Sequence, residues 1–193
     1  MQQAVIPNFI TDMECLEIIG IARNRTVRSQ GWNTNDGSQT VSDYRTSEHA
    51  FIDRLENPLV QSICNRIAQI TGFSVENQEA IQVAHYQPGK YYKVHWDYFD
   101  PDWAGSHHAF ARGGNRIITF MIYLNTIPEG YGGETYFDRA GLGIRPDAGK
   151  ACMWYNVFPN KKVDISTSHE GRPPKEPYEK WIATIWVRER RFT

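Results

Sequence analysis

The sequence has few cysteines, and none of them lie close together. Cys15, Cys64 and Cys152 are odd in number and separated by long stretches of chain. The disulfide framework of a small secreted domain requires a dense and even set of cysteines, and a thiolate zinc site requires closely spaced pairs. Neither is indicated, and reduced thiols in an intracellular protein are the simpler interpretation.

An excess of charge and a long apolar run are also lacking. The 21 basic and 22 acidic residues leave a net charge of -1, which gives no electrostatic case for nucleic acid or an anionic membrane as an obligatory partner. The N-terminal sequence MQQAVIPNF lacks the basic region and apolar run of a signal peptide, and no segment reaches the length of a membrane span. We expect a soluble, cytoplasmic protein without a nucleic-acid or membrane partner.

Two helices are predicted in the first part of the chain. Thr11 and Glu14 form a capping box, and apolar residues then recur at helical spacing as far as Arg23. Pro58 suits the first position of a second helix, and Gly72 suits the residue that ends it.

The segment between these helices, residues 24–47, is rich in Asn, Ser, Thr, Gly and Arg and shows no clear periodicity. It is predicted to be a long loop with short strands near Trp32 and Tyr44. Loops of this length in compact domains are often lids over a functional site. Disorder is the alternative, although Trp32, Val41 and Tyr44 give the segment apolar surface to bury.

From residue 81 onward the pattern becomes that of β-strands. Six segments are rich in β-branched and aromatic residues: 81–86, 91–97, 116–124, 134–137, 150–155 and 181–187. Helices followed by a run of strands indicate helices packed against an antiparallel sandwich or barrel. The segment 116–124 is apolar on both faces, as expected for a strand between two packed layers. At 193 residues we expect one domain over 1–193, with helical support in 1–79 and a β core in 80–193.

A histidine and an aspartate two residues apart give the first chemical signal. His95 and Asp97 fall in the predicted strand 91–97, where alternate side chains point to the same face and can contact one ion. Such a pair is weak by itself, because the two side chains more often hydrogen-bond each other or water. His169 is the one good candidate for a second imidazole, and it would complete the two-histidine, one-carboxylate set typical of non-haem Fe(II).

A lysine in the last predicted strand gives the second signal. Lys180 shares one face of that strand with Ile182, Thr184 and Trp186. A charge in this position needs an anionic partner, because burying an unpaired charge is costly. The carboxylate of a bound cosubstrate would supply one. Lys175 is an alternative candidate, but only Lys180 lies in register with the strand.

Other histidines and arginines have simpler interpretations. His107 and His108 are predicted to be a solvated loop pair, since no carboxylate or cysteine is spaced to complete a metal site with them. Arg188, Arg190 and Arg191 are predicted to form a solvated basic tail, with guidance of an acidic partner as the alternative.

Longer motifs follow one another along nearly the whole chain. They include RTSEHAF, VAHYQPGKYYKVHWDYFD, GGNRIITFMIYLN, EGYGGETYFD, SHEG and EKWIATIWV. In these motifs and their order the chain resembles the catalytic domain of the prolyl 4-hydroxylases, which are Fe(II)- and 2-oxoglutarate-dependent dioxygenases. The resemblance implies a mainly β fold, the double-stranded β-helix or cupin-like jelly roll, with N-terminal helices packed on one sheet.

The resemblance also implies roles for individual residues. The residues that match the iron ligands are His95, Asp97 and His169. Lys180 matches the lysine that pairs with the distal carboxylate of 2-oxoglutarate, although it follows the second histidine by one residue more than in the family. Residues that match the lining of the cosubstrate pocket are Tyr86 and Thr135, and those that match contacts to a peptide substrate are Tyr92, Arg116 and Trp186.

The activity that the resemblance implies is hydroxylation of prolyl residues, expected at carbon four, in a proline-containing peptide or protein. Dioxygen and 2-oxoglutarate would be consumed, succinate and carbon dioxide released, and ascorbate used as reductant. An alternative enzyme keeps these cofactors and acts on a free amino acid, a lysyl residue or another small molecule. A non-enzyme alternative, a jelly-roll module that binds a ligand without turnover, is disfavoured by the intact triad and lysine. The lack of an export signal and of an ER-retention tail favours a bacterial or viral origin.

Overall fold

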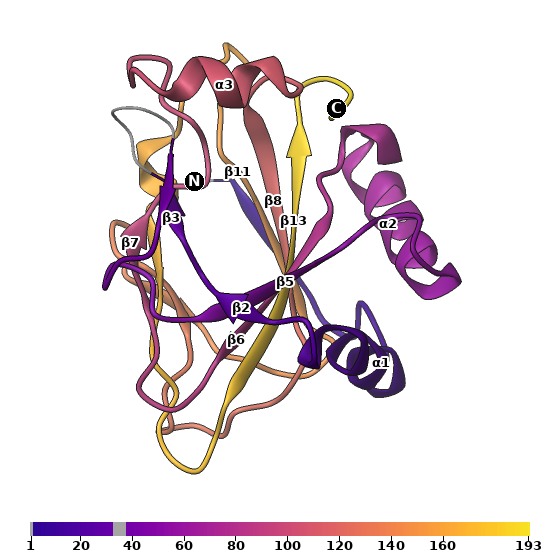
Figure 1. Cartoon of the computed structure of the whole chain (residues 1–193), viewed down its shortest axis with the longest axis vertical. Helices are drawn as coiled ribbons and strands as arrows, with labels where there is room; N and C mark the ends of the chain where they lie inside the picture. Colours follow the sequence, from indigo (N-terminus) through magenta and orange to yellow (C-terminus); the bar gives the residue numbers. More distant parts are fainter. Residues whose placement is uncertain (1, 33–37) are drawn as a thin grey trace.

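A computed structural model describes residues 2–32 and 38–193, which form two antiparallel sheets flanked by helices (Figure 1). The larger sheet has seven strands, in the spatial order β1 (Gln3–Ile6), β11 (Ala151–Tyr155), β8 (Arg116–Tyr123), β13 (Lys180–Arg188), β6 (Ile81–Tyr86), β5 (Glu48–Ile52) and β2 (Val27–Arg28). The smaller sheet has four, in the order β10 (Leu142–Ile144), β9 (Thr135–Phe137), β12 (His169–Gly171) and β7 (Tyr92–His95). A separate pair joins β3 (Gly31–Trp32) to β4 (Gln39–Thr40).

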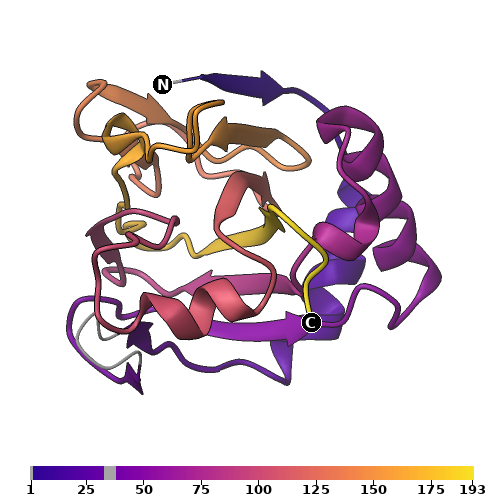
Figure 2. The ribbon, with the colours of Figure 1, turned by 90° about the horizontal axis from the view of Figure 1, so that it is seen from above.

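Both predicted helices are confirmed, and they lie together along one side of the larger sheet (Figure 2). The first, α1 (Asp12–Arg23), begins with the reciprocal capping box between Thr11 and Glu14. The second, α2 (Pro58–Thr71), ends at Gly72, whose φ of 73° is a left-handed conformation that favours glycine. Shorter helices are α3 (Ser106–Ala111), η1 (Val75–Asn77) and η2 (Ile165–Thr167).

The larger sheet is covered on both faces, which explains the doubly apolar pattern of β8. Ile118, Phe120 and Ile122 belong to the core cluster that the sheet shares with α1 and α2. Met121 and Tyr123 belong to a second cluster that lies between the two sheets. The mainly β architecture with flanking helices is therefore confirmed, and the two layered sheets are those of a double-stranded β-helix.

The predicted strands are largely confirmed, and one difference bears on the site. Five predicted segments correspond to β6, β8, β9, β11 and β13 with ends that differ by at most one residue. The strand predicted over 91–97 is shorter, because β7 ends at His95 and leaves Asp97 beyond it. Elements that were not predicted include β1, β5, β10, β12 and α3.

The segment 24–47 contains the short strands β2, β3 and β4 in its described part. Trp32 ends β3, as predicted, whereas Tyr44 lies in a turn, so the predicted strand there is wrong. Residues 33–37 fall outside the described residues, so a lid over the site stays a prediction.

Cys15, Cys64 and Cys152 are free and buried in the described structure, which confirms that they form no disulfide framework. None of the helices in residues 2–32 and 38–193 combines the length and apolarity that a bilayer crossing requires.

Candidate active site

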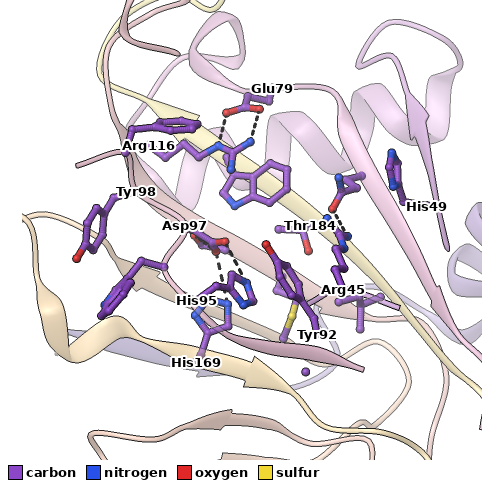
Figure 3. A pocket seen from close by; sticks show the side chains of 18 of the residues that line it. Arg45, His49, Glu79, Tyr92, His95, Asp97, Tyr98, Arg116, His169 and Thr184 are labelled. Carbon is purple, nitrogen blue, oxygen red and sulfur yellow. Dashed lines mark hydrogen bonds and ion pairs between the residues drawn. The ribbon is translucent and has the colours of Figure 1, made fainter. Parts of the chain in front are cut away.

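Three side chains that can bind a metal converge at the end of β7 (Figure 3). His95 ends β7 and His169 begins β12, and antiparallel pairing places the two residues directly opposite each other. Asp97 Oδ1 lies 3.6 Å from His95 Nε2, and Asp97 Oδ2 lies 3.7 Å from His169 Nε2. The potential ligand atoms all lie within 4.8 Å of one another, and the described residues contain no other such group of His, Cys, Asp and Glu.

A contact with the larger sheet positions Asp97, and the alternation of side chains along β7 does not. It lies beyond the end of β7, is only 7% exposed, and accepts a hydrogen bond of 2.8 Å from Thr119 Oγ1 on β8. Asn156 Nδ2 donates to the same Thr119 hydroxyl oxygen at 2.9 Å, so the hydroxyl proton is free to point at the carboxylate. The three side chains meet as predicted, but the predicted geometric reason was wrong for the aspartate.

Backbone carbonyls fix the orientation of both imidazoles. His95 Nδ1 lies 2.8 Å from the Lys93 carbonyl oxygen, and His169 Nδ1 lies 2.9 Å from that of Thr167. A carbonyl oxygen only accepts, so each Nδ1 carries the proton and each Nε2 presents a lone pair to the centre of the group. This is the usual way in which a ligating histidine is held.

Electrostatics also suit a cation at this position. Burial, and then His169, lower the pKa of His95 to about 3, which leaves its imidazole neutral. Burial alone would raise the pKa of Asp97, but His169, His95 and Arg116 more than offset it and hold that pKa below its ordinary value. A carboxylate with two imidazole nitrogens is a donor set that ferrous iron accepts, so these residues fit the metal that the resemblance implies.

Lys180 places a charged group in the same cavity without a partner. The side chain is fully buried at the start of β13, and Nζ has no hydrogen-bond partner among the described residues. Burial lowers its pKa to about 7, although Cys152 and Glu134 oppose the shift. Nζ lies 5.1 Å from the ring centroid of Tyr86, the residue paired with Lys180 across the sheet. Such a group fits an anion that arrives with a ligand.

The alternative lysine is excluded from the cavity. Lys175 is exposed, and its Nζ donates to the carbonyl oxygen of Gly130 at 3.0 Å. It does not line the cavity that contains the three potential ligands and Lys180, whose volume is about 500 Å³.

Tyr86 and Thr135 line that cavity together with Lys180, and their contact with a cosubstrate stays a prediction. Both are buried, and Thr135 Oγ1 lies 3.7 Å from the sulfur of Met121. Sequence reasoning missed another residue of the lining. Gly171 also lines the cavity, and a Cβ at this position would lie only 3.3 Å from the Tyr86 hydroxyl oxygen. Glycine therefore keeps this part of the cavity open.

Tyr92, Arg116 and Trp186 form an aromatic and cationic wall beside the triad. The Tyr92 ring is stacked on His95, with 3.5 Å between centroids and 12° between planes. The Arg116 guanidinium lies 3.6 Å from the Trp186 ring centroid, and Glu79 fixes it through two hydrogen bonds of 2.7 and 2.9 Å (Figure 3). Sequence reasoning missed Glu79, because a single acid before an apolar strand carries no distinctive signal.

Arg188 is not part of a solvated tail, so the prediction was wrong for this residue, whereas Arg190 and Arg191 are exposed as predicted. It is 3% exposed, lines the cavity, and donates from Nε to Glu79 Oε1 at 2.6 Å. The strand register contained the signal, because Arg188 continues the alternation of Lys180, Thr184 and Trp186 on the inner face of β13. His107 and His108 lie in the short helix α3 and not in a loop.

Comparison with known proteins agrees with this geometry. Residues 81–188 match the family described as the 2OG-Fe(II) oxygenase superfamily. Prolyl 4-hydroxylase 2 of Arabidopsis thaliana is 32% identical over 95% of this chain, and the prolyl 4-hydroxylase subunit alpha-1 of Gallus gallus is 33% identical over 95% of it. This chain spans 66% of the length of the first and 35% of the second, less than two thirds in each case.

A solved structure extends the likeness to the whole fold. The viral collagen prolyl hydroxylase of Paramecium Bursaria Chlorella virus-1, in its 2OG complex, superimposes with a TM-score of 0.76 at 29% identity. The match covers 97% of this chain and 96% of the viral one. Together with the superfamily match and the arrangement of His95, Asp97 and His169, these relatives show that the chain belongs to the prolyl 4-hydroxylase family of the 2OG-Fe(II) oxygenase superfamily.

Proposed function

We propose that this protein uses Fe(II), 2-oxoglutarate and dioxygen to hydroxylate prolyl residues, at carbon four, in a peptide or protein. The observation that carries the proposal is the presence, in one cavity, of the His95, Asp97 and His169 group and the unpartnered ammonium of Lys180. Relatives named as prolyl 4-hydroxylases, and the viral structure in its 2OG complex, support it. Overall, a substrate C–H bond, dioxygen and 2-oxoglutarate give the C–OH group, succinate and carbon dioxide.

When bound at this group of ligands, iron supplies with its cosubstrates the oxidation of an unactivated C–H bond. The contribution of the chain is orientation. The carbonyl oxygens of Lys93 and Thr167 keep the two Nε2 atoms facing inward, and Thr119 keeps the Asp97 carboxylate from rotating away. His95, Asp97 and His169 would hold the iron, and a set of two histidines and one carboxylate would leave further positions open to small molecules.

Lys180 would hold 2-oxoglutarate through the carboxylate farther from the metal. Its ammonium is a point charge with rotatable donors, and a carboxylate would satisfy the desolvated charge. Tyr86 and Thr135 line the same end of the cavity and would contact the chain of the cosubstrate. The buried site would also exclude bulk water from the reacting groups.

Tyr92, Arg116 and Trp186 would contact the peptide. Aromatic surfaces suit the extended polyproline II helix of proline-rich segments, which docks on grooves lined by aromatic side chains. Arg116 is held against Trp186 by Glu79, so its free edge keeps one orientation and could donate to a peptide carbonyl.

The test measures succinate formation with a panel of proline-containing peptides, and mass spectrometry locates any added oxygen atom. Turnover on peptides is expected for the natural sequence and for the control Lys175→Ala. His169→Ala should abolish it, and Lys180→Ala should raise the concentration of 2-oxoglutarate required. Brisk turnover of free amino acids with no oxygen added to peptidyl proline would refute the proposed substrate class. The absence of succinate with every substrate would refute the enzyme itself.

Three further parts of the proposal rest on the sequence. Residues 1–193 form one catalytic domain, the protein resides in the cytoplasm, and ascorbate serves as reductant. Cell fractionation checks the location, and dependence of prolonged turnover on added ascorbate checks the reductant.

A further inference from the structure

The cavity that holds the candidate metal site has an excess of cationic side chains in its wall. The charged residues that line it are Arg45, Arg112, Arg116, Lys180 and Arg188, against the carboxylates of Glu79 and Asp97. The whole chain has a net charge of -1, so this positive excess is local and does not follow from the overall composition. Clefts lined by one sign of charge focus the field on what they bind.

The two carboxylates do not neutralise this excess. Asp97 faces the two histidines, and Glu79 is shared between two guanidiniums, those of Arg116 and Arg188. Burial lowers the pKa of Arg188 to about 10, and although Glu79 opposes the shift, Arg116 and Arg112 add to it. The cations therefore crowd one another despite the shared glutamate.

Arg45 adds a buried charge whose contacts are all neutral. It is 7% exposed, and it donates to Ser47 Oγ at 3.1 Å and to Gln82 Oε1 at 2.8 Å. Its guanidinium lies 4.7 Å from the ring centroid of Tyr92, and no carboxylate of the described residues lies within ion-pair distance. After burial, the charge of Arg45 is the second cause that lowers the pKa of His49 to about 4.

Arg112 extends the positive charge to the outer end of the cavity, beside α3. It is exposed, its guanidinium lies 4.6 Å from the ring centroid of Phe192, and its Nε donates to the main-chain oxygen of Thr193 at 3.2 Å. In Figure 2, α3 and the C-terminal segment lie side by side at this end of the molecule. Arg45 precedes β5 and Arg112 follows α3, so two separate segments bring these charges to the cavity.

From this charge we infer that the cavity takes a proline-containing segment whose neighbouring residues are acidic. The inference rests on the proposed function for its proline and adds the charge of the flanking side chains. Aromatic surfaces of the wall would contact the proline, and carboxylates beside it would meet the guanidinium of Arg45, which has no acidic partner among the described residues, and the exposed guanidinium of Arg112. Complementary charge of this kind determines which segments are selected and how fast they bind.

Binding of three labelled peptides tests the inference without turnover. The peptides share one proline and differ only in flanking Glu, Gln or Lys, and fluorescence anisotropy measures Kd for protein loaded with Fe(II) and 2-oxoglutarate under anaerobic conditions. The Glu peptide is expected to bind about tenfold more tightly than the Lys peptide, with the Gln peptide between them. Raising the salt concentration from about 50 to about 300 mM should reduce this difference to about twofold, because screening weakens the charge contacts.

Two charge reversals locate the effect. Arg112→Glu should remove most of the preference for the Glu peptide, whereas Arg190→Glu should keep it. Arg190 is an exposed arginine that also contacts α3, through the Phe110 carbonyl oxygen, but it does not line the cavity. Equal Kd values for the three peptides, a preference for the Lys peptide, or equal effects of the two variants would overturn the inference. Hydroxylation of the Gln peptide is scored separately. Its absence counts against the proposed function, while the order of Kd values still decides the charge preference.

Discussion

Lys180 occupies a position that reduces the stability of the fold. Its ammonium is fully buried without a hydrogen-bond partner in the described structure, and burial lowers its pKa to about 7. A buried charge without a partner is among the costly features of a protein interior. Its retention on a strand that is otherwise well packed indicates a role with a ligand.

Replacing this lysine should therefore stabilise the protein while disabling cosubstrate binding. Lys180→Met keeps the length of the side chain and removes the charge, so we expect the free energy of unfolding of the metal-free protein to rise by about 1–3 kcal/mol. Thermal unfolding with Fe(II), in the absence of dioxygen, should show that 2-oxoglutarate stabilises the natural protein and no longer stabilises the variant. Lys175→Met, at an exposed lysine, should retain that stabilisation. A less stable Lys180→Met protein would contradict the argument.

Thr119 is a second residue whose role can be isolated, because it contacts Asp97 without being a ligand. Thr119→Val removes the hydroxyl that donates to the carboxylate, and we expect metal affinity to fall about tenfold or more. Calorimetric titration with Fe(II) under anaerobic conditions measures the change, and circular dichroism checks that the fold is intact. Thr184→Val, an equivalent change on neighbouring β13, should alter the affinity by less than about twofold. Equal losses in both variants would show that Thr119 acts only through packing.

Among the secondary-structure elements, the two long helices are determined by residues within or next to their own segments. Asn57 begins α2, and its side chain accepts a hydrogen bond of 2.9 Å from the backbone N–H of Val60. Asn57→Ala should lower the free energy of unfolding in urea by about 1 kcal/mol, because the first turn loses this acceptor. Asn65→Ala, on the exposed face of the same helix, should cause no loss, since alanine favours the helix interior. The cap would have no energetic role if the two variants were equally stable.

This local character explains which elements the sequence predicts. Both helices have capping residues and apolar spacing, and β8 and β13 are long enough to show their patterns. By contrast, β12 has three residues, too few for any periodicity, and it forms because β7 and β9 pair with it from both sides. Such strands depend on distant partners, which a pattern along the chain does not identify.

The candidate site likewise contains residues that the sequence reveals and residues that only the fold reveals. The spacing of His95 and Asp97 and the strand register of Lys180 were visible in the sequence, and the family resemblance added Tyr86 and Thr135. Contacts made across the sheet were not visible. Glu79, for example, lies just before β6 and joins Arg116 of β8 to Arg188 of β13, an arrangement that follows from strand order.

For the molecule as a whole, the buried lysine makes stability depend on pH in a defined direction. In the unfolded chain Lys180 keeps its proton up to its ordinary pKa of 10.5, whereas in the fold it loses the proton near pH 7. Between these values the unfolded state binds more protons, so the free energy of unfolding rises with pH. The stability gained by Lys180→Met should therefore be greatest below about pH 7 and shrink as the pH approaches 10.5. Urea unfolding of both metal-free proteins across this range measures the difference, and a difference independent of pH would contradict the burial of the charge.

The pairing of β7 with β12 has a consequence for how tightly different parts of the molecule are held. β7 lies at the margin of the smaller sheet and pairs with β12 alone in that sheet, and the two candidate imidazole ligands face each other across this pair. An ion bound by both imidazoles would link two strands that are distant along the chain. When a chelator removes the metal, amide hydrogen exchange should accelerate in β7 and β12 while β8 and β13 remain protected. Uniform acceleration in all four strands would argue against this link. A protein that has lost its metal would then loosen first at the strand pair that carries the two imidazoles.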